Sequence, residues 1–245
     1  MILLLLLLLL APTFGYAAVT VDTTSSGEGI SATTATSSHS HTIAADANLV
    51  VVCLAERDTD AGGITADTAS VTVGGASATK LNAVTNPDAT SRGVFFYKLA
   101  PATGSQTIAV TADTGTNRLT TGVISLKGAA QTSTFNTSST NSSNTGTDAD
   151  LNGIASAVGE FVVLCGSSVT AAASASPDAT APASTEQLDV ANSDSTSIRV
   201  WVYTEDGAAS TTDIRVDLAS GNRWTMVGVA VRQLSSAFGP MRRRH

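Results

Sequence analysis

The sequence predicts an all-β protein, a jelly-roll-like antiparallel β-sandwich formed by two internally repeated halves. Three observations support this. Segments recur at a nearly constant spacing, Thr and Val are abundant while helix-favouring residues are sparse beyond the N-terminal segment, and some apolar runs alternate with polar residues. A half with one apolar face needs a partner sheet to cover it, so two such halves favour a sandwich.

The repeat is clearest around the two cysteines. The run NLVVVCLAE around Cys53 returns as EFVVLCGSS around Cys165, 112 residues later. Other matched residues are 106 apart, Tyr97 with Tyr203 and Ile108 with Ile214. The repeated halves therefore extend over about residues 45–130 and 155–235.

Individual strands follow from the pattern of apolar residues. The runs Leu49–Glu56 and Glu160–Gly166 are apolar on both faces, which is typical of central, covered strands. In Asp213–Leu218 apolar and charged residues alternate, as in a strand with one buried face. Further strands are expected at 70–73, 78–81, 94–99, 106–111, 119–127, 185–190, 198–205 and 223–234.

A single domain is expected over residues 19–235. Two arrangements fit: one sandwich in which both halves contribute to both sheets, and two small sandwiches in tandem. The covered appearance of the strands that carry Cys53 and Val162 favours the single sandwich. Residues 131–147 are polar and of low complexity, so they are expected to form a linker or a long surface loop, and residues 236–245 form a basic tail.

The apolar leader, residues 1–18, has two interpretations. Its run from Ile2 to Leu10 is too short to cross a bilayer but has the length of the hydrophobic part of a secretion signal. Small residues near Ala17 offer a cleavage site, whereas no Lys or Arg precedes the run. The alternative is an apolar arm that inserts into a neighbouring subunit.

The charge balance argues against nucleic acid as a partner. Charged residues make up only 13% of the chain and the net charge is −7, whereas phosphate binding needs a basic surface. Solubility therefore depends on hydroxyl groups and a few carboxylates, and the basic segment Arg242–Arg244 is too short to reverse the balance.

The cysteines occupy equivalent positions in two apolar runs. Cys53 and Cys165 are therefore either a pair of small buried residues or, in an oxidising compartment, a disulfide. A catalytic or metal-binding thiol is not expected, because no basic group near either cysteine would lower its pKa.

Few side chains suggest a metal or a reaction. Asp58 and Asp60 precede two glycines and offer oxygen ligands to calcium, but no acidic residue closes the loop, so a solvated turn is the alternative. His39 and His41 lie on one face of a strand, and zinc would need more ligands. A nucleophile elbow of the form G-x-S-x-G does not occur in the sequence, so an enzyme and a cofactor are not expected.

One strand carries a candidate ligand-binding face. Four of its residues alternate so as to share a face, Arg199, Trp201, Tyr203 and Glu205, with Phe95 and Tyr97 as their repeat equivalents. An aromatic strip beside charged groups suits a carbohydrate, because a flat ring packs on the apolar face of a sugar. The same strip is also typical of core packing between two sheets.

Several segments together resemble a recurrent β-sandwich module of tailed-phage structural proteins and of bacterial secreted or surface proteins. The matching features are His41 before a strand and then Leu49–Val52, Gly74-Gly75, Leu99–Gly104 and Gly122-Val123. The resemblance covers about residues 20–235 and implies the fold, but it carries over no catalytic residues. The chain departs from the module in its cysteines and its leucine-rich leader.

These observations predict a non-enzymatic structural or adhesive protein. It would be a virion component (decoration, fibre or tail-associated) or a subunit of another extracellular assembly, with other structural subunits or further copies of itself as partners and no membrane span. The alternative is a secreted carbohydrate-binding module that uses the face of Trp201 and Tyr203.

Overall fold

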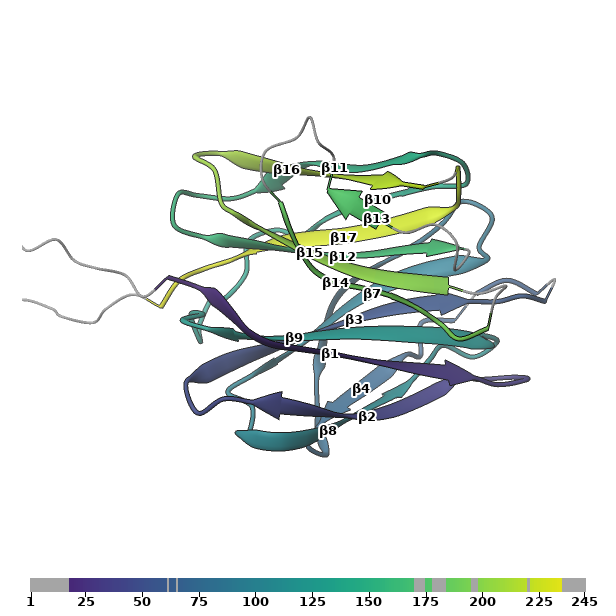
Figure 1. Cartoon of the computed structure of the whole chain (residues 1–245), viewed down its shortest axis with the longest axis horizontal. Helices are drawn as coiled ribbons and strands as arrows, with labels where there is room; N and C mark the ends of the chain where they lie inside the picture. The colour runs from purple at the N-terminus through teal and green to yellow at the C-terminus, as the bar shows by residue number, and fades with distance from the viewer. Residues whose placement is uncertain are drawn as a thin grey trace, which may run out of the picture.

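The computed structural model describes residues 18–60, 62–64, 66–169, 175–177, 184–194, 198–219 and 221–234. Within these residues the chain forms seventeen strands and no helix, so the predicted all-β class is confirmed (Figure 1). Consequently no helix in the described part of the chain is long and apolar enough to span a membrane. Leader residues 1–17 and the tail 236–245 lie outside the described residues.

Strands β1 to β9 build the first half as two antiparallel sheets. The first inner sheet has the order β1-β9-β3-β7-β6, and the first outer sheet has the order β2-β8-β4-β5. The bounds are β1 Thr20–Ile30, β2 Thr36–Ile43, β3 Ala47–Arg57, β4 Ser70–Val73, β5 Ala76–Ser77, β6 Thr79–Thr85, β7 Ser91–Leu99, β8 Gly104–Thr111 and β9 Arg118–Lys127.

Strands β10 to β17 build the second half in the same way. The second inner sheet has the order β10-β17-β12-β15-β14, and the second outer sheet has the order β11-β16-β13. The bounds are β10 Ser139–Ser143, β11 Asp148–Ala155, β12 Phe161–Val169, β13 Ala175–Pro177, β14 Thr185–Ala191, β15 Ile198–Asp206, β16 Thr211–Leu218 and β17 Trp224–Val231.

The four sheets stack as four layers, with the two inner sheets back to back between the two outer ones (Figure 1). Each half therefore completes a sandwich of its own, whereas the expected single sandwich had both halves contributing to both sheets. In each half the chain alternates between the two sheets, as in a jelly roll. The strand order is equivalent in the two halves, and duplication as its origin stays a prediction.

The stacking explains why the inner strands are apolar on both faces. In β3, Val51 and Cys53 pack in the central core between the inner sheets, while Val50 and Val52 pack in the first outer core. Successive side chains of a strand point to opposite faces, so a strand covered on both sides needs apolar residues at every position. Each fully buried Val contributes about 1.5–3 kcal/mol relative to an exposed one.

A disulfide and a close approach of backbone to side chain join the inner sheets. Cys53 and Cys165 are bonded across the central core, with their Cα atoms 5.3 Å apart. A side chain at Gly122 would meet the Leu188 Cδ2 at 2.7 Å, so glycine allows β9 to lie close to the second inner sheet. The two halves are therefore in direct contact.

Residues 131–147, expected as a polar linker, include the edge strand β10, which pairs with β17. Phe135 packs against the central core, and its ring lies edge-on to Tyr97 with centroids 4.7 Å apart. The connection between the halves therefore continues the second inner sheet and covers one side of the central core.

Candidate functional site

The predicted aromatic face lies inside the protein. Trp201 and Tyr203 have no exposed surface and pack edge-to-face in the core between the second inner and outer sheets, with ring centroids 6.0 Å apart. The Tyr203 hydroxyl donates to Glu186 at 3.1 Å. Because β15 is covered on both faces, neither ring is accessible to a sugar, and the core-packing interpretation holds.

The charged members of the same face also have internal surroundings. Arg199 pairs with Asp189 at 2.6 Å. Glu205 is half-buried, and burial, with smaller effects from Asp206 and Asp213, raises its pKa to about 7. Both charged groups are therefore partly buried within the second half and do not form an open binding face with the aromatic rings.

The aromatic residues of the two halves are not equivalent in the way the sequence match suggested. Cys53 lies opposite Phe95, and Cys165 lies opposite Val202, so counting from the cysteines makes Phe96 the equivalent of Tyr203. Tyr97 faces the central core instead. A shift of one residue exchanges the two faces of a strand, which is why the match of Tyr97 with Tyr203 misplaces the ring.

The acidic loop after β3 is a local turn. Asp58 is buried, and its Oδ1 accepts the N–H of Asp60 at 2.8 Å, the usual way in which an aspartate stabilises its own backbone. Asn117 accepts the N–H of Thr59 at 3.1 Å. No three His, Cys, Asp or Glu side chains of the described residues gather so as to hold a metal, and calcium binding by Asp58 and Asp60 stays a prediction.

A buried charged cluster lies beside this loop and was not predicted from the sequence. The guanidinium of Arg92 donates to Ala66 O at 2.7 Å and pairs with Asp113 and Asp67. Asp113 is fully buried and accepts the N–H of Ala69 at 2.8 Å. The cluster therefore fixes the loop that connects β3 to β4 onto the end of the sandwich.

Glu56 completes this cluster. Its side chain is fully buried, and its Oε1 accepts the N–H of Asp113 at 2.9 Å. Burial, together with the nearby negative charge of Asp113, raises the pKa of Glu56 to about 8, so it is protonated at neutral pH. The available sequence signal was a charged residue ending an otherwise apolar strand.

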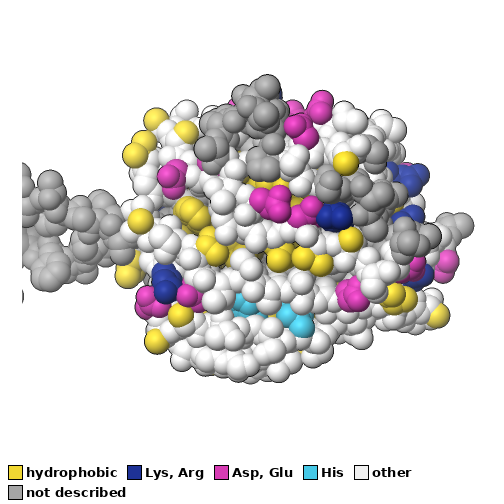
Figure 2. All heavy atoms as spheres, in the orientation of Figure 1, with side chains coloured by type: hydrophobic (Ala, Val, Ile, Leu, Met, Phe, Trp, Pro, Cys, Tyr) yellow, Lys and Arg dark blue, Asp and Glu magenta, His cyan; other side chains and the backbone are white. Residues whose placement is uncertain are grey.

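His39 and His41 lie on β2, and their rings face β1. His41 is buried, and its Nδ1 is 2.8 Å from the Ser25 hydroxyl, while Gly27 leaves room for the His39 ring. Burial and, secondarily, the neighbouring His39 lower the pKa of His41 to about 4. Histidine atoms are visible in the space-filling view (Figure 2), where His39 is the more exposed of the two. The third histidine, His245, lies outside the described residues.

One end of the molecule combines the chain ends with exposed apolar groups. β1 begins there and β17 ends there, so both chain ends leave the four-sheet body at this end (Figure 1). Hydrophobic side chains lie around the same end in Figure 2. Val158, in the turn between β11 and β12, is 80% exposed, and Leu234 is 45% exposed.

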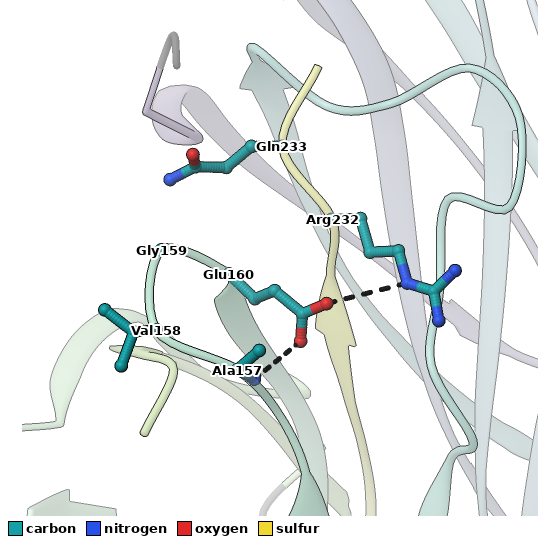
Figure 3. A pocket seen from close by; sticks show the side chains of 6 residues that line it. All are labelled: Ala157, Val158, Gly159, Glu160, Arg232 and Gln233. Atoms are coloured by element: carbon teal, nitrogen blue, oxygen red, sulfur yellow. Dashed lines mark hydrogen bonds and ion pairs between the residues drawn. The ribbon is translucent and has the colours of Figure 1, made fainter. Parts of the chain in front are cut away.

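Two hollows flank the Val158 turn. One has a volume of about 320 Å³ and is shown in Figure 3; its lining residues are Ala157, Val158, Gly159, Glu160, Arg232 and Gln233. The other, of about 300 Å³, shares the turn and adds Ala18, Val19, Phe161, Asp206 and Gly207. This site was not predicted from the sequence, because a single Val in a turn belongs to no recognisable motif.

A hydrogen-bond network supports the turn from below. The Glu160 carboxylate accepts the N–H of Ala157 at 2.8 Å and lies 3.5 Å from the Arg232 Nε (Figure 3). Asn136 donates to Glu160 at 2.5 Å and accepts from Arg232 at 3.0 Å. The charged groups are thus paired with one another, and the apolar side chain is the one left toward solvent.

Comparison with known proteins adds no relative. No family model matches the chain, and neither a curated protein nor a solved structure does.

Proposed function

We propose that the protein is a non-enzymatic structural or adhesive subunit, either of a virion or of another extracellular assembly. The observation that carries the proposal is that β1 begins and β17 ends at one end of a disulfide-joined, four-sheet body. Val158, the most exposed large hydrophobic side chain among the described residues, lies at the same end. An end of this kind suits attachment to a further subunit, and a stack of four sheets with three buried cores suits a rigid body.

The disulfide supports an extracellular or virion location. Disulfides persist in oxidising surroundings and are rare in proteins of the reducing cytosol. Cys53 and Cys165 are buried, so their bond is shielded from thiols in solution. The buried charges support a structural role, because Arg92 and Asp113 are used to hold a loop of the sandwich itself.

Self-association of the full chain tests the proposal. Sedimentation equilibrium over a hundredfold range of concentration should show a reversible or stable assembly of defined stoichiometry. A chain that remains monomeric throughout that range, with residues 1–245 intact by mass, would contradict assembly with copies of itself.

A further inference from the structure

Val158 is held in solvent by a fixed turn. Glu160 donates its N–H to the Ala157 carbonyl at 3.0 Å and accepts the Ala157 N–H at 2.8 Å through its carboxylate. Gly207 also donates its N–H to the Glu160 carbonyl at 2.8 Å. The backbone on both sides of Val158 is therefore tied down, and its exposure is a property of the folded turn.

The Val158 turn forms a ridge between the two hollows. Val158 and Gly159 line both of them, and in Figure 3 the Val158 side chain points away from the Glu160–Arg232 pair. Apolar groups of Val19 and Phe161 contribute to the second hollow. An apolar segment that crosses this ridge can place one side chain in each hollow, with Val158 packed between them.

The chain itself supplies such a segment. Ile2–Leu10 is a run of nine apolar residues, and an extended segment of that length spans about 30 Å. Residues 11–17, which connect it to Ala18, reach up to about 25 Å when extended. Ala18 lines the second hollow, so the connection starts at the rim of the site.

We propose that the Val158 turn and its two hollows bind the apolar segment Ile2–Leu10 of a second copy of the chain. This inference rests on the proposed function, in which copies assemble. In each copy the described chain begins at Ala18, on the rim of the binding site, so two copies that face each other at this end can exchange segments reciprocally. Such an exchange closes on itself and produces a two-fold dimer instead of an open fibre.

Charge substitution on the exposed turn tests the binding site. Val158→Asp places a carboxylate where the proposed segment packs, and the dimer dissociation constant of the full chain should rise at least tenfold in sedimentation equilibrium. Ile30→Asp is the matched control, because Ile30 is also an exposed large hydrophobic residue (52%) but lies at the far end of β1. The control should leave the dissociation constant unchanged.

Mixed cysteine variants test whether the segment comes from a second copy. Leu6→Cys in one preparation and Val158→Cys in another should give, after mixing and mild oxidation, a covalent product that contains one copy of each. A chain carrying both substitutions that forms only an internal bond would overturn the inference, since the segment would then bind its own copy.

Other outcomes separate this inference from the proposed function. If the chain assembles but Val158→Asp has no effect, or if the assembled chain begins near Ala17 by mass spectrometry, the segment exchange is overturned and assembly stands. If the unsubstituted full chain never associates, the proposed function fails together with the exchange.

Discussion

The two halves of the molecule share one strand order but fill their own cores differently. Beside the cysteine positions, Leu54 lies opposite Val94 in the first half, and Gly166 lies opposite Trp201 in the second. A side chain at Gly166 would overlap the Trp201 ring, so the large ring occupies the space that glycine leaves. The comparison teaches that the same strand order can accommodate different residues at a cross-strand pair, provided that their two side chains together fill the same space in the core.

Exchanging this pair is the strongest test of the comparison. Gly166→Leu should overpack the second core and Trp201→Val should leave a cavity, each lowering the free energy of unfolding by about 3 kcal/mol. The double variant restores the arrangement of the first half, so its loss should be smaller than the sum of the single losses by at least about 1 kcal/mol. Urea unfolding measures all three, and strict additivity would contradict volume compensation.

The halves also differ in their buried charges. Arg92 and Arg199 occupy equivalent positions, opposite Glu56 and Ser168, but Asp113 beside Arg92 has a fully buried side chain whereas Asp189 beside Arg199 retains 10% exposure. Arg92→Met should therefore lower the free energy of unfolding by about 3 kcal/mol, because it leaves a buried carboxylate unpaired. Arg199→Met should cost about half as much, since Asp189 can regain water. Equal losses in thermal unfolding would show that the two clusters are energetically alike.

Glu56 gives the first half a dependence on pH that the second half lacks at this position. Burial raises the pKa of Glu56 from 4.5 to about 8, so between these values the folded protein keeps a proton that the unfolded chain releases. The contribution of this bound proton to the free energy of unfolding is complete below pH 4.5 and is lost as the pH rises toward 8.

Glu56→Gln removes this titration while keeping the shape of the side chain. From pH 6 to pH 7 the unsubstituted protein should lose about 1.4 kcal/mol of stability relative to this variant. Urea unfolding at several pH values measures the difference. Parallel pH profiles for the two proteins would mean that Glu56 does not titrate in this window.

The sequence was informative wherever a single strand explains the pattern. Runs apolar on both faces predicted covered strands, and β3 and β12 are covered. The equivalent cysteine positions left two alternatives, a pair of small buried residues or a disulfide, and the structure has the disulfide. The predicted single sandwich did not account for these runs, because each sheet of a two-layer sandwich has one face in solvent, whereas a strand that is apolar on both faces needs a covering sheet on each side.

The candidate sites were harder to predict because they depend on which face each residue takes. Trp201 and Tyr203 alternate correctly for a shared face, but only the position of the second outer sheet shows that this face is closed. Val158 becomes notable only when its turn is seen between two hollows at the end where the chain ends leave. Both cases depend on contacts between segments far apart in the chain.

Because β1 begins and β17 ends at one end of the molecule, attachment through the chain ends would leave the opposite end facing solvent. The described connections 31–35, 58–60, 86–90, 112–117 and 192–194 all lie at the opposite pole, where β1 and β3 end and β7 and β9 begin. If the protein is tethered through its ends, these connections form the outermost tip of a projection about one strand long. Substitutions in these connections would therefore change the surface that contacts a partner first, and would leave the attached end unchanged.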